Sequence, residues 1–102
     1  MKHLKHKFHA KPTVNDGIKF ASKKEANYYN VLKTKQASGE ILFFLRQVPL
    51  HLPGQIRYVV DFLVFYANGS VEFIDVKGVV TPVYKTKKAI AEATYPIQIV
   101  EV

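Results

Sequence analysis

The sequence contains no cysteine among its 102 residues. Disulfide bridges, thiolate zinc sites and thiol nucleophiles are therefore excluded, so any bound metal has to be held by oxygen or imidazole ligands. The sequence also lacks an apolar run near the ~20 residues that span a bilayer, and its first residues lack the apolar core of a signal peptide. These two absences predict a cytoplasmic protein.

Acidic residues are scarce relative to basic ones. Eight Asp and Glu stand against fifteen Lys and Arg, which gives a net charge of +7. On so small a surface this surplus favours a polyanionic partner, most simply a nucleic acid, with an anionic membrane as the weaker alternative. The apolar fraction of 48% and the aromatic fraction of 13% indicate a folded chain, and the length indicates one domain.

The start of the chain is basic and shows no helical or strand periodicity. Residues 1–17 hold several lysines and three of the four histidines. They predict a basic N-terminal arm, followed by a single domain over residues 18–102. His3, His6 and His9 recur at every third position, which suggests zinc, but solvated histidines in an arm are the favoured interpretation.

Residues 22–37 carry the signals of a helix with defined ends. Ser22 followed by Glu25 is a capping box, and Gly39 lies where a helix C-terminus favours a positive φ. The inward stripe of this helix includes Tyr29 and Leu32, and Glu25 falls on the same side. The Glu25 carboxylate either returns a hydrogen bond to the Ser22 amide or projects toward a sheet, and the sequence leaves both open.

The remainder reads as three strands, a helix and a final strand. Pro49 predicts that the first strand bends or lies at a sheet edge, Thr81 and Pro82 begin the helix, and Pro96 ends it. A helix that joins two strands is a crossover connection, which requires a parallel pair in a mixed sheet. The sequence therefore predicts an α/β fold with the order αβββαβ and helices flanking a mixed sheet. Its strands cover residues 40–52, 57–66, 70–80 and 97–102, and its second helix covers residues 81–95.

Three charged residues interrupt the two central apolar strands. Asp61 lies in one strand, and Asp75 and Lys77 lie in the next. Because Asp75 and Lys77 are two residues apart, their side chains point to the same face, roughly 6–7 Å from each other. Neighbouring buried carboxylates repel, which raises one pKa unless a cation lies between them. Mg²⁺ suits such a pair because it takes carboxylate oxygens and keeps waters and phosphates as its other ligands. The structural alternative is one buried aspartate paired with Lys77.

The length of the hairpin loop decides whether the two aspartates can meet. A two-residue loop of Asn68 and Gly69 would place Asp61 and Asp75 on opposite faces of the sheet. A three-residue loop that begins at Ala67 would set them opposite each other, with Gly69 in the left-handed position that this loop requires. We therefore expect the three-residue loop.

Four charged residues form one pattern: Glu25 on a helix, then Asp61, then Asp75 and Lys77 with one residue between them. This pattern resembles the PD-(D/E)xK nuclease motif. The predicted αβββαβ order resembles the restriction-endonuclease-like core of that family. The first motif departs from the family in reading Val-Asp rather than Pro-Asp, and its second acid is Asp rather than Glu. Four segments are similar to a short phage-encoded family formerly classed as a domain of unknown function, and more distantly to Holliday junction resolvases and the transposon-end endonuclease of cut-and-paste elements: FASKKEANYY, RQVPL, RYVVDFLVF and VEFIDVKGVVTPVYKTKKA.

The resemblance implies a Mg²⁺-dependent DNA endonuclease, with Mn²⁺ as a substitute, that resolves Holliday junctions or nicks DNA in the host-cell cytoplasm. Asp61, Asp75 and the Val76 carbonyl would bind the metal, and Glu25 would complete the site directly or through a water. Lys77 would orient or help to deprotonate the attacking water. Gln47 would be an accessory residue. The DNA phosphates would be held by Lys5, Lys7, Lys11, Lys85, Lys87 and Lys88.

Two other function classes stay open. One is a non-catalytic nucleic-acid-binding module on a nuclease-like fold, and the other is a small basic RNA-binding protein whose acids are structural. Symmetric cleavage of two strands by a chain with one site would imply a homodimer. Tyr84, on the second predicted helix, is expected to pack in the core rather than to stack on bases.

Overall fold

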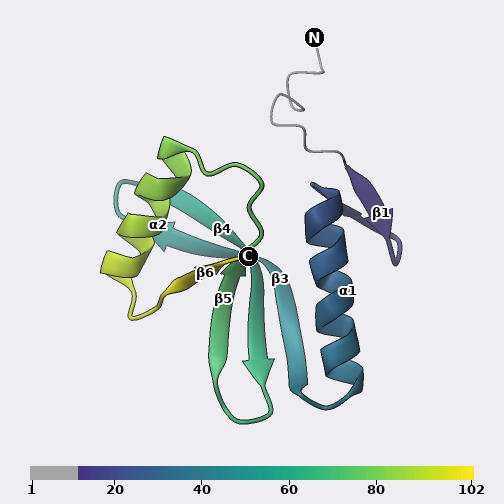
Figure 1. Cartoon of the computed structure of the whole chain (residues 1–102). Helices are drawn as coiled ribbons and strands as arrows, with labels where there is room; N and C mark the ends of the chain where they lie inside the picture. The colour runs from purple at the N-terminus through teal and green to yellow at the C-terminus, as the bar shows by residue number, and fades with distance from the viewer. Residues whose placement is uncertain (1–11) are drawn as a thin grey trace.

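The computed structural model describes residues 12–102, which form an α/β fold of two helices and six strands (Figure 1). The predicted order of helix, three strands, helix and strand is confirmed, and a short hairpin precedes it. Neither helix in this range is long and apolar enough to cross a membrane. The elements are β1 (Thr13–Asn15), β2 (Ile18–Phe20), α1 (Lys23–Ala37), β3 (Ile41–Leu52), β4 (Ile56–Tyr66), β5 (Val71–Asp75), α2 (Pro82–Thr94) and β6 (Ile99–Glu101).

Both helices begin at the residues that the sequence predicts. The Ser22 hydroxyl accepts a hydrogen bond from the Glu25 amide at 3.1 Å, and the Thr81 hydroxyl accepts one from the Tyr84 amide at 3.1 Å. Each bond satisfies an amide that has no partner within its own helix. Gly39 follows the end of α1 with φ +87°, a left-handed conformation that only glycine adopts without strain.

The main sheet is mixed and has the order β3-β4-β5-β6. The pairs β3/β4 and β4/β5 are antiparallel, whereas β5/β6 is parallel, as the crossover through α2 requires. In Figure 1 the strands spread between the two helices. The prediction that Pro49 lies in an edge strand is confirmed, because β3 is at one edge of this sheet.

Strand β5 is shorter than predicted and ends at Asp75. Beyond it the chain stays attached to the last strand by two backbone bonds. The Val102 amide donates to the Asp75 carbonyl at 2.9 Å, and the Lys77 amide donates to the Val102 carbonyl at 3.1 Å. The backbone on both sides of Val76 is therefore held in place by residues at the end of β6.

The β4–β5 loop has the predicted three-residue length. The Tyr66 amide donates to the Ser70 carbonyl at 2.9 Å, and the Gly69 amide donates to the Tyr66 carbonyl at 3.0 Å. Gly69 has φ +91°, which is the left-handed position of this turn. The strands pair Phe62 with Ile74, and one step further along this register Asp61 is level with Asp75.

Strand β4 contributes to two separate hydrophobic clusters. Phe62 and Val64 pack with residues of α1, whereas Tyr58 and Val60 pack with residues of α2. These four residues alternate along β4 and therefore lie on one face of the strand. Because the sheet twists, one end of this face packs against α1 and the other end against α2. The change occurs at Asp61, and this residue therefore lies at the junction between the two clusters.

The N-terminal hairpin corrects the predicted boundary of the basic arm. Strands β1 and β2 pair with each other, the Asn15 side chain donates to Asn30 at 2.7 Å, and the Tyr29 hydroxyl donates to Asp16 at 3.1 Å. The folded part of the chain thus begins before residue 18, because residues 13–17 are attached to α1. The arm residues that were assigned to DNA or zinc binding lie outside the described residues: Lys5, Lys7, Lys11, His3, His6 and His9.

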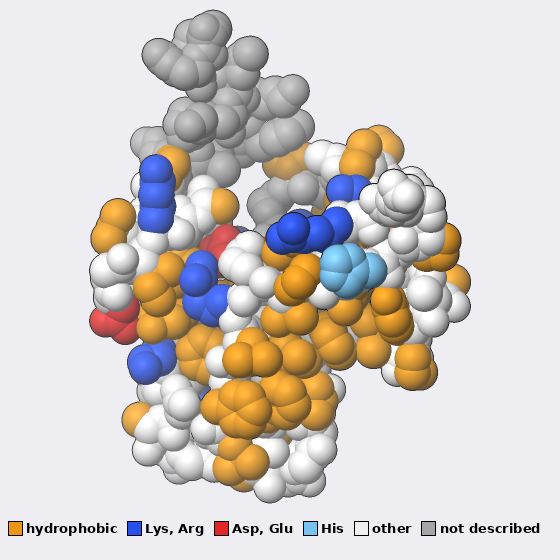
Figure 2. All heavy atoms as spheres, turned by 180° about the vertical axis from the view of Figure 1, so that it is seen from behind, with side chains coloured by type: hydrophobic (Ala, Val, Ile, Leu, Met, Phe, Trp, Pro, Cys, Tyr) orange, Lys and Arg blue, Asp and Glu red, His pale blue; other side chains and the backbone are white. Residues whose placement is uncertain are grey.

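One face of the main sheet exposes apolar side chains. Phe43 is 44% exposed and Leu45 is 47% exposed on β3, and Val71 is 48% exposed on β5. The rings of Phe43 and Phe65 stack with centroids 4.4 Å apart. Figure 2 shows apolar side chains gathered over the lower half of the molecule, where Figure 1 places these strands. Helix α1 covers the opposite face through the Phe62 and Val64 side.

Candidate active site

Asp61 and Asp75 connect β4 and β5 at the point where the two strands separate. The last residue pair of the ladder is Phe62 with Ile74. Beyond it the Asp61 amide donates to Asp75 Oδ1 at 2.9 Å, and the Val76 amide donates to Asp61 Oδ2 at 2.9 Å. Each carboxylate therefore binds a backbone amide of the other strand, so the two acids lie side by side.

Asp75 is fully buried, with a relative exposure of 0%. The Tyr58 hydroxyl donates a hydrogen bond to Asp75 Oδ2, and Lys77 Nζ lies 3.9 Å from the same oxygen. Lys77 Nζ also lies 4.2 Å from the centroid of the Tyr84 ring, a cation–π contact that fixes the ammonium group. The Asp75–Lys77 pair is the contact that the structural alternative requires, but Asp61 forms no ion pair with a residue between 12 and 102.

Glu25 projects from α1 toward the sheet, which resolves the two alternatives left by the sequence. Its side chain is only 5% exposed, and Gln47 Nε2 donates to Glu25 Oε2 at 3.1 Å. The same Gln47 nitrogen lies 3.5 Å from Asp61 Oδ1. Gln47 therefore connects the helix carboxylate with the strand carboxylate.

The backbone of Gln47 explains how two neighbouring residues of β3 reach the same carboxylate. In a regular strand Arg46 and Gln47 would point to opposite faces. Gln47 has φ +54°, a left-handed conformation that costs about 1–3 kcal/mol in a non-glycine residue. Arg46 Nη2 lies 4.0 Å from Glu25 Oε2, the same oxygen that accepts the hydrogen bond from the Gln47 side chain. Such strain is found where a strand redirects side chains at a functional site.

The site concentrates negative charge in a region sheltered from water. Burial and, after it, the charge of Asp61 raise the pKa of Glu25 to about 7, although Arg46 and a backbone hydrogen bond at Ala21 act to lower it. Burial also raises the pKa of Asp61, against the lowering effect of the Val76 amide bond. A cation at this position would favour the ionised form of both acids.

The carboxylates fit a hard divalent cation by donor chemistry but do not form a closed cage. Within residues 12–102 no three His, Asp or Glu side chains are arranged as a ready set of metal ligands. Each carboxylate oxygen has about two lone pairs, so Asp61 and Asp75 can accept a cation in addition to their present bonds. Among the described residues, Asp61 Oδ1 has only the 3.5 Å contact from Gln47, which leaves it lone-pair capacity for a metal.

The lysines of α2 differ in whether their ammonium groups already bind other residues of the protein. Lys88 Nζ pairs with Glu101 at 3.1 Å, and Lys87 Nζ donates to the Arg57 carbonyl at 3.4 Å. Lys85 is exposed on α2 and makes no ion pair with a residue in the described range. Of the three lysines of α2 that the sequence assigns to DNA phosphates, Lys85 therefore has the most freedom. As expected, Tyr84 packs in the core, with an exposure of 7%.

Two basic residues at the site were missed by the sequence analysis. Lys24 Nζ donates to the Lys77 carbonyl at 2.8 Å, and Arg46 lies beside Glu25. The sequence indicates these two residues only by their neighbours: Lys24 directly precedes Glu25 on the helix, and Arg46 directly precedes Gln47 in the segment RQVPL. Neither signal distinguishes these residues from ordinary surface cations.

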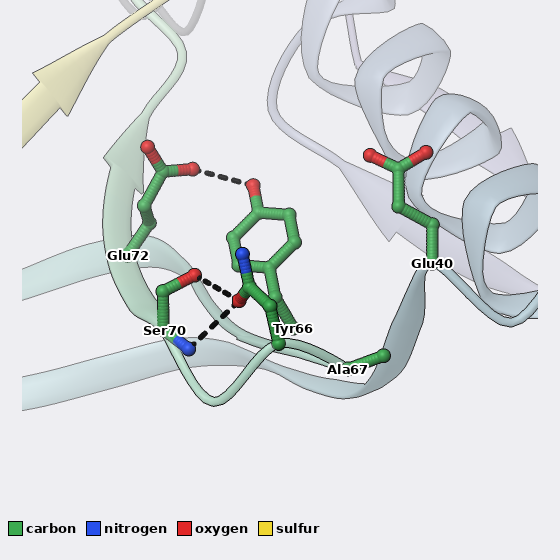
Figure 3. A pocket seen from close by; sticks show the side chains of 6 residues that line it. Glu40, Tyr66, Ala67, Ser70 and Glu72 are labelled. Carbon is green, nitrogen blue, oxygen red and sulfur yellow. Dashed lines mark hydrogen bonds between the residues drawn. The ribbon is translucent and has the colours of Figure 1, made fainter.

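A separate cleft of about 480 Å³ lies at the far end of the β4–β5 hairpin (Figure 3). Its walls carry Glu40 and Glu72, and the Tyr66 hydroxyl donates a hydrogen bond to Glu72. Burial and this bond raise the pKa of Tyr66. None of the predicted site residues lines this cleft. The candidate site is therefore the carboxylate cluster.

Residues 5–100 match a family described as "Protein of unknown function (DUF1064)". The chain belongs to this family. No curated protein and no solved structure matches it. The DUF1064 match includes all four elements that supply the site, namely α1, β3, β4 and β5. Because the DUF1064 description states no function, the functional argument depends on the chemistry of the residues themselves.

Glu25 predicts a pH dependence of stability. Its folded pKa of about 7 lies above the ordinary value of 4.5, so the folded state retains a proton that the unfolded state loses between these values. The contribution to stability is therefore complete below pH 4.5 and is lost as the pH rises through 7. The Glu25→Gln variant stays neutral, and we expect its stability relative to wild type to rise by about 1–2 kcal/mol from low to neutral pH.

Urea unfolding in EDTA at a series of pH values measures this difference. The control is Glu40→Gln, which removes an exposed carboxylate at the other end of α1 and should show no comparable trend. A stability difference between Glu25→Gln and wild type that does not change with pH would contradict the raised pKa.

Proposed function

We propose that this protein is a Mg²⁺-dependent DNA endonuclease that acts in the cytoplasm. The observation that supports it is the convergence of Glu25, Asp61 and Asp75 with Lys77 where β4 and β5 separate. The +7 charge of the chain adds a preference for a polyanionic substrate. The resemblance to the PD-(D/E)xK nucleases gives these residues matching roles.

The proposed roles are those that the resemblance implies, and the contacts are compatible with them. Asp61 and Asp75, with the Val76 carbonyl, would hold the metal, and Glu25 would be linked to it through Gln47. The chemistry that Mg²⁺ supplies when bound is polarisation of the scissile phosphate and activation of a water. Lys77 is held between Asp75 and the Tyr84 ring, where its ammonium would orient the attacking water.

Lys24 and the final strand would support this arrangement. The Lys24 ammonium donates to the Lys77 carbonyl, and the Val102 backbone binds both neighbours of Val76. Three contacts from distant segments thus fix the backbone that presents the acid and the lysine. A rigid backbone of this kind favours the precise placement of reacting groups that hydrolysis requires.

A panel of labelled DNA structures tests the proposal. Four-way junction, flap, fork and linear duplex are incubated with the protein and Mg²⁺, with Mn²⁺, or with EDTA. We expect cleavage of at least one substrate with either metal and none with EDTA. Calorimetric titration with Mg²⁺ alone should show binding, and a protein that cleaves none of these substrates with either metal would contradict the proposal.

A non-catalytic nucleic-acid-binding module is the second candidate. It is favoured by the contacts of Asp75, whose two oxygens are both bonded within the protein. Such a module would bind the same DNA panel with an affinity that falls with salt but would leave every substrate intact in Mg²⁺ and Mn²⁺. An RNA-binding module would instead prefer labelled RNA of the same length.

Assembly gives a further expected outcome. Symmetric cleavage of a junction requires two sites related by a two-fold axis, and we propose a homodimer for that activity. The exposed apolar face that includes Phe43, Leu45 and Val71 is the surface that it would bury. Sedimentation at micromolar concentration with junction DNA should report a mass of two chains, whereas one chain would restrict the activity to nicking.

A further inference from the structure

Arg46 is a charged residue at the site for which the proposed mechanism has no role. Its guanidinium lies over the Phe20 ring, 4.4 Å from the ring centroid, and its side chain is 24% exposed. Arg46 Nη2 lies 4.0 Å from Glu25 Oε2, which is beyond hydrogen-bond distance. The arginine is therefore held beside the carboxylate cluster by stacking and by charge.

The hydrogen-bond partners of Arg46 are incomplete. A guanidinium has five N–H donors, and Arg46 donates none of them to a residue between 12 and 102. Its Nε is buried without a partner. An unpaired buried donor destabilises a protein, and an apolar residue stacked on Phe20 would avoid this penalty. Packing alone therefore does not account for an arginine at this position.

Neutralisation of the Glu25 carboxylate does not account for Arg46 either. The charge of Arg46 lowers the pKa of Glu25, but burial and Asp61 still raise it to about 7. Gln47 already supplies the hydrogen bond to the carboxylate. A planar fork with free donors, stiffened against an aromatic ring, is in contrast suited to two oxygens of one phosphate group.

We propose that Arg46 is a phosphate-binding residue of the site, whose guanidinium receives a DNA backbone phosphate next to the one that is cleaved. This inference rests on the proposed function in taking DNA as the substrate. The left-handed backbone at Gln47 has the effect of bringing the fork and the accessory amide to the same carboxylate. Arg46 and Gln47 both approach Glu25 Oε2, at 4.0 and 3.1 Å.

Metal-free DNA binding tests the inference without depending on cleavage. Fluorescence anisotropy of labelled junction and duplex DNA in EDTA is measured over a series of salt concentrations. We expect Arg46→Gln to weaken binding about tenfold and to reduce the slope of log affinity against log salt by about 1, the value of one phosphate contact. Arg46→Lys keeps the charge but loses the planar guanidinium. Its DNA affinity should therefore lie between that of wild type and that of Arg46→Gln.

The matched control is Arg57→Gln, which removes the same charge from an exposed position. We expect it to change affinity less than about twofold and to leave the salt slope unchanged. Circular dichroism melting confirms that each variant is folded. A folded Arg46→Gln with the wild-type slope, or an Arg57→Gln with an equal loss, would overturn the assignment.

The failure of this inference is distinct from the failure of the proposed function. If wild type binds and cleaves DNA while Arg46→Gln binds with unchanged affinity and slope, only the role of Arg46 is overturned. If wild type binds DNA but cleaves none of the panel, the nuclease is overturned, and a reduced salt slope in Arg46→Gln still supports the phosphate contact. If wild type binds no DNA, both are overturned.

Discussion

The Asp61→Asn and Asp75→Asn variants should each lose DNA cleavage by about a thousandfold or more, because a metal site that loses a carboxylate charge gives up several kcal/mol of transition-state stabilisation. Asparagine keeps the size of the side chain and one acceptor oxygen. The amide bonds from Asp61 to Asp75 and from Val76 to Asp61 can therefore persist. DNA affinity should stay within about threefold of wild type, because it depends on basic residues.

Single-turnover cleavage and metal-free anisotropy measure the two quantities separately. Glu40→Gln is the control, because Glu40 is exposed at the α1–β3 turn and pairs with Lys35 at 3.7 Å. This variant should cleave at nearly the wild-type rate. If Asp61→Asn or Asp75→Asn also did so, the assignment of these acids to a metal site would have to be abandoned.

Tyr58→Phe should destabilise the fold by about 2 kcal/mol, the effect of losing a hydrogen bond to a buried charged group. Tyr58 donates to Asp75, which is fully buried and has Lys77 as its other neighbour at 3.9 Å from the same oxygen. Burial raises the pKa of Tyr58, and the bond to Asp75 raises it further. The hydroxyl therefore stays protonated and remains a donor at ordinary pH.

The measurement is urea unfolding of a double-mutant cycle. In the Asp75→Asn background Tyr58→Phe should cost less than in wild type, because no charged acceptor is left unpaired. The control is Tyr28→Phe, which removes a half-buried hydroxyl that donates no hydrogen bond within the described chain. Equal costs of Tyr58→Phe in the two backgrounds would show that the bond to Asp75 does not stabilise the fold.

Much of the fold could be predicted because its signals are local. Ser22 and Thr81 signal the helix starts through their own side chains, and Gly69 allows the positive φ that the hairpin loop requires. The loop length then sets the register of the hairpin, and the register brings Asp61 level with Asp75. The helix starts depend on residues within a few positions of one another, whereas the three-residue loop was expected because it sets Asp61 opposite Asp75.

The features that were missed depend on distant contacts. Strand β1 is attached to α1 through the Asn15–Asn30 bond, and nothing in the sequence near Asn15 signals that partner. The left-handed backbone at Gln47 has no turn residue to announce it, since it is stabilised by contacts with Glu25 and Asp61. The position of Arg46 follows from that backbone. The convergence of the acidic residues could therefore be predicted, whereas the positions of the surrounding basic residues could not.

The backbone bonds between Val102 and the residues on either side of Val76 have a consequence for the order of events during synthesis. Ribosomes add roughly 5–20 residues per second, so Lys77 is made one to several seconds before the strand that fixes it. The parallel β5–β6 pair also closes a long loop, and long-range pairing of this type is slow. A nascent chain can therefore form the β3–β5 meander early, but we expect it to acquire an ordered Asp75–Lys77 segment only after β6 has docked.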